Sequence, residues 1–116
     1  WGKWMLNCGV NQTIAFYEGT YDTVQQPGIA REHMIEAMRE AAACSTAEGI
    51  PLGEADISVW VSIVDGLNPD SLPSMRQDQL AGRPMELDLF SVVVMELGRK
   101  HGILTPVNEM FFERLR

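Results

Sequence analysis

The first seventeen residues read Trp1-Gly-Lys3-Trp-Met-Leu-Asn7-Cys-Gly-Val-Asn11-Gln-Thr-Ile-Ala-Phe-Tyr17. Apolar side chains fill most of this stretch, and no proline interrupts it. Lys3, Asn7 and Asn11 recur every fourth residue, so in a helix of about 100° per residue they form one stripe roughly 80° wide. A helix that is apolar on most of its other sides belongs in a protein core. The stretch therefore predicts a buried helix that carries a single polar stripe.

This polar stripe has two interpretations. Polar groups in apolar surroundings must find partners, and one ammonium with two amides suits an oxygen-rich anion. Alternatively, the stripe faces solvent or forms a buried network that only fixes packing, which is common for amphipathic helices. On the opposite face, Gly2 and Gly9 would let another helix approach closely.

The middle of the chain is also predicted to be helical. Amphipathic spacing predicts a helix over residues 29–48, ended by Gly49. Residues 55–64 fit helical and strand spacing equally, and their β-branched content favours a strand. A helix is predicted because no other segment offers a strand partner. The turn residues of 66–73 predict a loop, and the glycines and proline of 18–28 predict a connector.

Ser74 begins a short predicted helix. Ser74 followed by Gln77 fits a capping box, and the helix should run to about Ala81 and end at Gly82. Capping alone would explain this serine, but a hydroxyl at a helix N-terminus also suits a carboxylate ligand, and both readings can hold together.

Two further helices complete the prediction. Residues 86–101 fit a helix with Glu86 and Asp88 in its first turn and basic residues in its last, ended by Gly102. Thr105-Pro106 fits the N-cap and first residue of the last helix. Glu86 has two interpretations. An acid in the first turn is favoured by the helix dipole, and the functional alternative is that its carboxylate pairs with Lys3. The chain is thus predicted to be one all-α domain, 1–116, with five to seven helices.

Composition excludes several classes of protein. A net charge of −7 without a basic cluster argues against nucleic acid, and no apolar stretch is long enough to span a membrane. Cys8, Cys44, His33 and His101 lack the spacing of metal ligands, so no metal site is predicted. The two cysteines fit small buried groups in a reducing cytoplasm, and a cytoplasmic protein is expected. Because the chain begins at Trp1 inside a helical pattern, we expect it to be a piece of a longer polypeptide.

Three motifs together resemble the ketopantoate reductase (2-dehydropantoate 2-reductase) family. Lys3-Trp-Met-Leu-Asn7-Cys-Gly-Val-Asn11 is similar to that family's K-x-x-x-N-x-x-x-N helix. Ser74-Met-Arg-Gln-Asp, followed by Gly-Arg-Pro-Met-Glu86-Leu-Asp, resembles its S-M-x-Q-D…R-x-T-E-I-D signature. His-Gly-Ile-Leu-Thr-Pro-Val-Asn, over 101–108, resembles its H-G-[IV]-x-[TV]-P-x-N run. The order and separation of the motifs agree over essentially the whole chain.

The resemblance implies a helical bundle of the 6-phosphogluconate-dehydrogenase C-terminal-domain type. The parent enzyme would be an NADP-dependent oxidoreductase that reduces 2-dehydropantoate to (R)-pantoate, in the pathway to pantothenate and coenzyme A. An N-terminal Rossmann domain, absent here, would hold most of the NADPH. The isolated fragment, as the C-terminal half, is expected to be inactive, and it should expose an apolar surface that self-association into a homodimer could cover.

The resemblance also implies roles for five residues. Lys3 would be the general acid, and Glu86 would orient Lys3 or the substrate hydroxyl and touch the cofactor ribose. Asn7 and Asn11 would bind the substrate's hydroxyl and carbonyl oxygens, and Ser74 would bind its carboxylate.

The chain departs from the family pattern at four positions. Gln12 replaces the usual Pro, Pro73 a Ser and Met85 a Thr. Glu18, before Gly19, stands where a substrate-contacting Asn is expected, and an acid there would repel a substrate carboxylate. The alternatives are therefore a reductase of a different 2-oxo acid on the same fold, or a non-catalytic helical association module.

Overall fold

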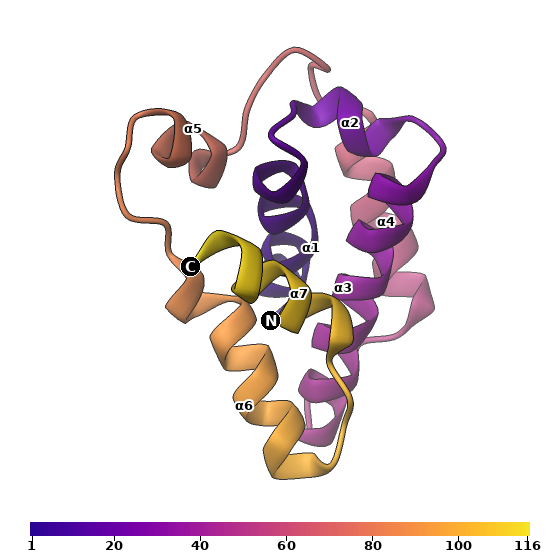
Figure 1. Cartoon of the computed structure of the whole chain (residues 1–116). Helices are drawn as coiled ribbons and strands as arrows, with labels where there is room; N and C mark the ends of the chain where they lie inside the picture. The colour runs from indigo at the N-terminus through magenta and orange to yellow at the C-terminus, as the bar shows by residue number, and fades with distance from the viewer.

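The computed structural model describes residues 1–116, and every regular element in it is helical. The chain forms seven α-helices, arranged as in Figure 1, and one 3-10 turn lies between the fifth and sixth. No helix is long and apolar enough to cross a membrane. The predicted fold class and number of helices are confirmed. The elements are α1 (Gly2–Tyr17), α2 (Tyr21–Gln25), α3 (Ile29–Ala47), α4 (Glu54–Asp65), α5 (Ser74–Leu80), η1 (Leu87–Leu89), α6 (Ser91–His101) and α7 (Pro106–Leu115).

Helix α1 lies at the centre of the fold, with α2, α3, α4, α5 and α7 packed against it (Figure 1). Its residues from Cys8 to Ala15 are all buried. The predicted close approach at its glycines is confirmed: a Cβ at Gly9 would lie 2.9 Å from the carbonyl oxygen of Met34 on α3. A glycine is therefore required there for α1 and α3 to pack at this distance.

The long helix and the ambiguous segment both behave as predicted. Helix α3 ends just before Gly49, whose φ of 90° is the left-handed conformation that glycine favours. Residues 55–64 lie within helix α4, so the helical prediction for this segment is confirmed.

The connector 18–28 differs from the prediction because it contains the short helix α2. The N–H groups of Tyr21 and Asp22 at the start of α2 donate to the carbonyl oxygens of Ser71 and Pro69, at 3.2 and 3.0 Å. These acceptors belong to the distant 66–73 loop, and the helix therefore depends on contacts that a local sequence pattern does not predict.

A buried polar network links α1 with three other helices. The fully buried Gln12 amide donates to the Cys8 carbonyl (2.7 Å) and to Asn108 Oδ1 (3.0 Å). Its oxygen accepts the N–H of Ser91 at 3.0 Å. Asn108 in turn donates to Glu40 Oε1 on α3 at 2.9 Å. Because directional bonds fix geometry where apolar packing does not, this network sets the rotation of α1 within the core.

Glu40 also caps the last helix. Thr105 and Pro106 occupy the predicted N-cap and first positions of α7, but the Thr105 side chain makes no capping bond. The Glu40 carboxylate instead accepts the N–H groups of Val107 (2.9 Å) and Asn108 (3.0 Å). Burial raises the pKa of Glu40, and hydrogen bonds from Asn108 and Val107 oppose that rise.

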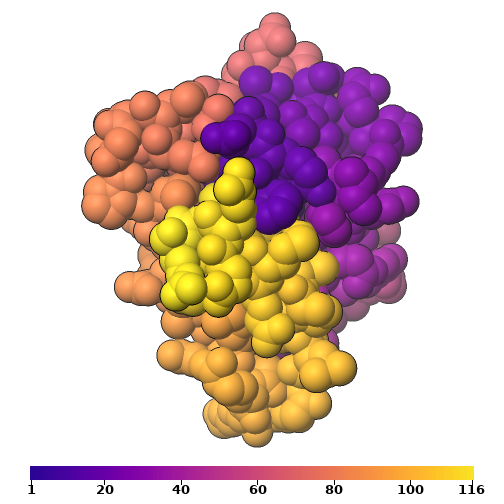
Figure 2. All heavy atoms as spheres, viewed as in Figure 1, coloured from indigo at the N-terminus to yellow at the C-terminus, as the bar shows by residue number.

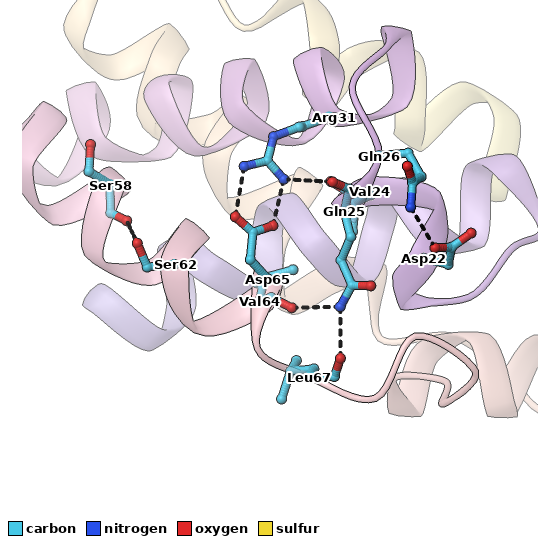
Figure 3. Close-up of polar contacts among 10 residues, drawn as sticks. All are labelled: Asp22, Val24, Gln25, Gln26, Arg31, Ser58, Ser62, Val64, Asp65 and Leu67. Carbon is cyan, nitrogen blue, oxygen red and sulfur yellow. Dashed lines mark hydrogen bonds and ion pairs between the residues drawn. The ribbon is translucent and has the colours of Figure 1, made fainter.

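An ion pair joins α3 to the end of α4 (Figure 3). Arg31 donates to both carboxylate oxygens of Asp65, at 2.6 and 2.9 Å, and to the carbonyl of Val24 at 3.0 Å. Gln25 donates to the carbonyls of Val64 and Leu67, at 2.9 Å each, where α4 ends. The hydrogen bond from Arg31 holds the pKa of Asp65 below its usual value.

Asp65→Asn should lower the free energy of unfolding near neutral pH by about 0.5 kcal/mol, because solvent screens this half-exposed pair. A carboxyl with a lowered folded-state pKa stabilises the fold above about pH 4 and loses that contribution as the pH falls further. The difference between wild type and variant should therefore shrink in urea titrations at about pH 3.

Asp70→Asn is the matched control, because Asp70 lies exposed in the 66–73 loop and its side chain makes no ion pair. An Asp65→Asn effect of the same size at both pH values would contradict the assignment of the pair.

Candidate functional site

The residues of the polar stripe become more buried along α1, from Lys3 to Asn11. Lys3 is exposed, Asn7 is half-buried, and Asn11 is buried with 8% of its surface exposed. None of the three side chains makes a hydrogen bond or ion pair within the chain. The polar atoms of the Asn11 side chain are not fully enclosed, so a ligand can reach all three groups.

Helix α5 lies beside the C-terminal half of α1. Gln79 donates to the carbonyl of Ala15 and Arg76 to the carbonyl of Glu18, at 3.2 Å each. In Figure 2, indigo atoms of the first part of the chain reach the surface between the orange-red atoms of α5 and the yellow atoms of α7. The face of α1 next to α5 is therefore not fully enclosed by the other helices.

Ser74 is the first residue of α5, and its hydroxyl has no partner in the chain. The predicted capping box is wrong: Pro73 is the N-cap, and the Gln77 side chain donates to the Leu72 carbonyl at 2.9 Å. Pro73 has φ −71° and ψ 163°, so the fixed proline φ places the extended capping residue one position earlier. Ser74 is left exposed with a free hydroxyl.

The predicted helix over 86–101 is wrong at its start. Leu87–Leu89 form the turn η1, α6 begins at Ser91, and Phe90 breaks the helical path with φ −118° and ψ −94°. Two side chains of α1 bond the backbone on either side of the break. Trp4 Nε1 donates to the Leu89 carbonyl at 2.8 Å, and Gln12 accepts the N–H of Ser91.

The hydrogen bond from Trp4 to the Leu89 carbonyl therefore holds the segment after Glu86 beside the start of α1, since Trp4 follows Lys3 and Leu89 lies three residues after Glu86. The two side chains do not form an ion pair with each other. Both side chains are exposed. No group of three or more His, Cys, Asp or Glu side chains could hold a metal ion.

Glu18, the residue that departs from the family pattern, ends α1. It is the one non-glycine residue with a left-handed backbone, at φ 52° and ψ 45°. Continued at about 100° per residue, α1 would place Glu18 on the face of Lys3, Asn7 and Asn11. The left-handed backbone takes Glu18 off this path, so its exposed carboxylate adds a negative charge at the C-terminal end of α1.

Sequence reasoning missed Trp4 and Gln12 as residues that connect the site to the core. Trp4 offered no signal, because its bond to Leu89 joins residues 85 apart in the chain. Gln12 offered a weak one: it is a carboxamide on the apolar side of α1, about 180° from Lys3.

The helical arrangement corresponds to the C-terminal domains of ketopantoate reductases. The ketopantoate reductase from Staphylococcus aureus superposes with a TM-score of 0.93 at 22% identity, over 100% of this chain and 40% of that one. The 2-dehydropantoate 2-reductase from Geobacter metallireducens gives 0.90 at 23% identity, over 99% of this chain and 38% of that one. A D-mandelate dehydrogenase gives 0.85 at 21% identity, over 98% and 44%. At these identities the likeness shows the fold.

The family itself is shown by sequence. The family model for the C-terminal part of ketopantoate reductase PanE/ApbA matches residues 1–116, so the chain belongs to that family. It is 32% identical to the 2-dehydropantoate 2-reductase of Caulobacter vibrioides over 95% of its length, and 30% identical to that of Vibrio cholerae over 100%. The chain spans 37% and 39% of the lengths of these two relatives.

Two neighbouring substitutions test which amides are free for a ligand. Asn11→Leu should change the free energy of unfolding by less than about 1 kcal/mol, because no bond within the chain is lost. Gln12→Met, of similar size, should cost about 2–3 kcal/mol because it leaves the Ser91 N–H and the Asn108 side-chain oxygen unpaired. Chemical denaturation measures both.

Each variant serves as the control for the other, since both lie in the same turn of α1 and both exchange an amide for an apolar group. Equal costs for the two would mean that Asn11 is a structural amide and not a ligand group.

Proposed function

We propose that this chain is the substrate-binding and catalytic domain of an NADPH-dependent 2-dehydropantoate 2-reductase. One observation carries the proposal: Lys3, Asn7 and Asn11 form a stripe without partners on α1, flanked by the segments that hold Ser74 and Glu86. Family membership supports the same activity, since the curated relatives are 2-dehydropantoate 2-reductases.

The stripe suits the reduction of a 2-oxo acid. Hydride addition places negative charge on the former carbonyl oxygen, and the Lys3 ammonium can stabilise that charge and donate the proton. Asn7 and Asn11 would donate hydrogen bonds to the substrate's oxygens and fix its orientation against α1. Asn7 is half-buried and Asn11 is buried, so the surrounding side chains would shield part of each contact from water.

Ser74 and Glu86 would bind from the flanking segments. The free Ser74 hydroxyl on α5 would donate to the substrate carboxylate. The Glu86 carboxylate would accept a hydrogen bond from the substrate hydroxyl or orient the Lys3 ammonium.

The NADPH would be held mainly by an N-terminal Rossmann domain. When bound, it supplies the hydride. The residues of this chain fit only part of the cofactor: the exposed Glu86 carboxylate could accept a ribose hydroxyl, but a net charge of −7 and the absence of a glycine-rich loop do not suit its phosphates.

An apolar surface near the start of α1 suits the docking of that second domain. Trp1, Trp4 and Val93 line a shallow hollow, and the nearby Leu89 side chain is 54% exposed. Such patches mark interaction surfaces in soluble proteins. The S. aureus relative is described as dimeric, and a homodimer of this protein is the alternative occupant.

A reductase of a different 2-oxo acid is the second candidate function. Glu18 favours it, because a carboxylate at the C-terminal end of α1 disfavours a substrate with negative charge there and favours one with a hydrogen-bond donor. The reaction and the roles of Lys3, Asn7 and Asn11 would be the same.

The polypeptide that joins this chain to an N-terminal Rossmann domain should oxidise NADPH when 2-dehydropantoate is added. The 116 residues alone should show no turnover, because they lack the phosphate-binding loop. Lys3→Met in the complete polypeptide should lower kcat by about a hundredfold or more, through loss of the general acid. Absorbance of NADPH measures each rate.

Lys100→Met is the matched control, because Lys100 is an exposed lysine whose bond to Glu48 joins α3 to the far end of α6. Turnover of other 2-oxo acids but not of 2-dehydropantoate would select the second candidate. No turnover of any 2-oxo acid would leave a non-catalytic association module.

A further inference from the structure

The segment that carries Glu86 has little regular structure of its own to hold it. Glu86 precedes the single 3-10 turn η1, and Phe90 separates that turn from α6. Leu87 and Phe90 are buried at 8% exposure each, which fixes the depth of the segment. Apolar packing is non-directional, so these two side chains alone do not fix its position along α1.

Two hydrogen bonds from side chains of α1 fix the position of this segment along the helix. The Trp4 indole N–H donates to the Leu89 carbonyl at 2.8 Å, and the Gln12 carboxamide oxygen accepts the Ser91 N–H at 3.0 Å. The two backbone groups lie on either side of Phe90, where the helical path is broken and no helical partner is available. One backbone acceptor, the Leu89 carbonyl, and one backbone donor, the Ser91 N–H, are thereby both satisfied by side chains of α1.

The same helix carries the proposed proton donor. Trp4 is the neighbour of Lys3, and its ring packs edge-on against Trp1 with the ring centroids 5.3 Å apart. Gln12 is fully buried, and its amide is held by Cys8 and Asn108. Both residues therefore lie on the helix that carries the stripe, and each has contacts that orient its side chain.

We propose that Trp4 and Gln12 are positioning residues, which hold the Glu86 segment in register with Lys3, Asn7 and Asn11. The inference rests on the proposed function and adds two residues that touch neither substrate nor cofactor through their polar atoms. They act through Glu86: the bonds at Leu89 and Ser91 determine where its carboxylate stands relative to Lys3.

Trp4→Phe tests the proposal most cleanly, because it removes the N–H donor and keeps an aromatic ring in place. In the complete polypeptide, we expect kcat/KM for the turned-over 2-oxo acid to fall roughly tenfold to a hundredfold, as misplacement of a catalytic group does. Trp60→Phe is the matched control, since the Trp60 indole packs near Gly2 without a hydrogen bond and its variant should keep the wild-type kcat/KM.

A double-mutant cycle with Glu86→Gln separates positioning from general stability. If Trp4 acts through Glu86, Trp4→Phe should have little further effect on kcat/KM when Glu86 is already Gln. A purely structural role would give the same fold loss in both backgrounds, and that result would overturn the inference.

If Trp4→Phe lowers the folded fraction in thermal unfolding, the rates of all four members of the cycle are divided by their folded fractions. The corrected effect of Trp4→Phe should still vanish in the Glu86→Gln background. A wild-type polypeptide inactive on every 2-oxo acid would overturn the proposed function and this inference with it. An active one with independent, multiplicative effects would overturn only this inference.

Discussion

The buried carboxamide of Gln12 is the constraint on which the rest of the structure depends. Its three hydrogen bonds reach the backbone of its own helix, the start of α6 and Asn108 of α7. Asn108 extends the connection to Glu40, which caps α7. A buried amide tolerates few arrangements, because each unmade bond is costly. The rotation of α1 is fixed as a consequence, and with it the direction of every other side chain on that helix.

Because the rotation of α1 is fixed, this helix has two faces with different roles. On the core face, Gln12 has every polar atom paired, and Gly9 lets α3 pack closely. On the other face, Asn7 and Asn11 are at least half-buried but have no partner within the chain. Sites that bind ligands commonly forgo stability in this way, since the polar groups they need are satisfied only when the ligand is present.

The sequence predicted those features of the fold that depend on local pattern. The helices α1 and α3 follow from apolar spacing, α4 follows from the lack of any strand partner, and the left-handed Gly49 follows from its place after a periodic run. The residues proposed for the site came from the family resemblance, and the structure supplied their surroundings. The helix α2, the break at Phe90 and the cap from Glu40 could not be predicted, because each depends on partners 47 to 85 residues away in the chain. Such tertiary bonds override local propensity and leave no periodic signal.

The central claim is that the unpaired amides of α1 bind the 2-oxo acid while the paired amides of the core do not. It is tested most directly by following side-chain amide resonances of the complete polypeptide in heteronuclear NMR as 2-dehydropantoate is added with NADP⁺ present. The account predicts that the signals of Asn7 and Asn11 shift with saturation, whereas those of Gln12 and Asn108 stay in place. Unmoved signals for both Asn7 and Asn11 at saturating ligand would contradict it.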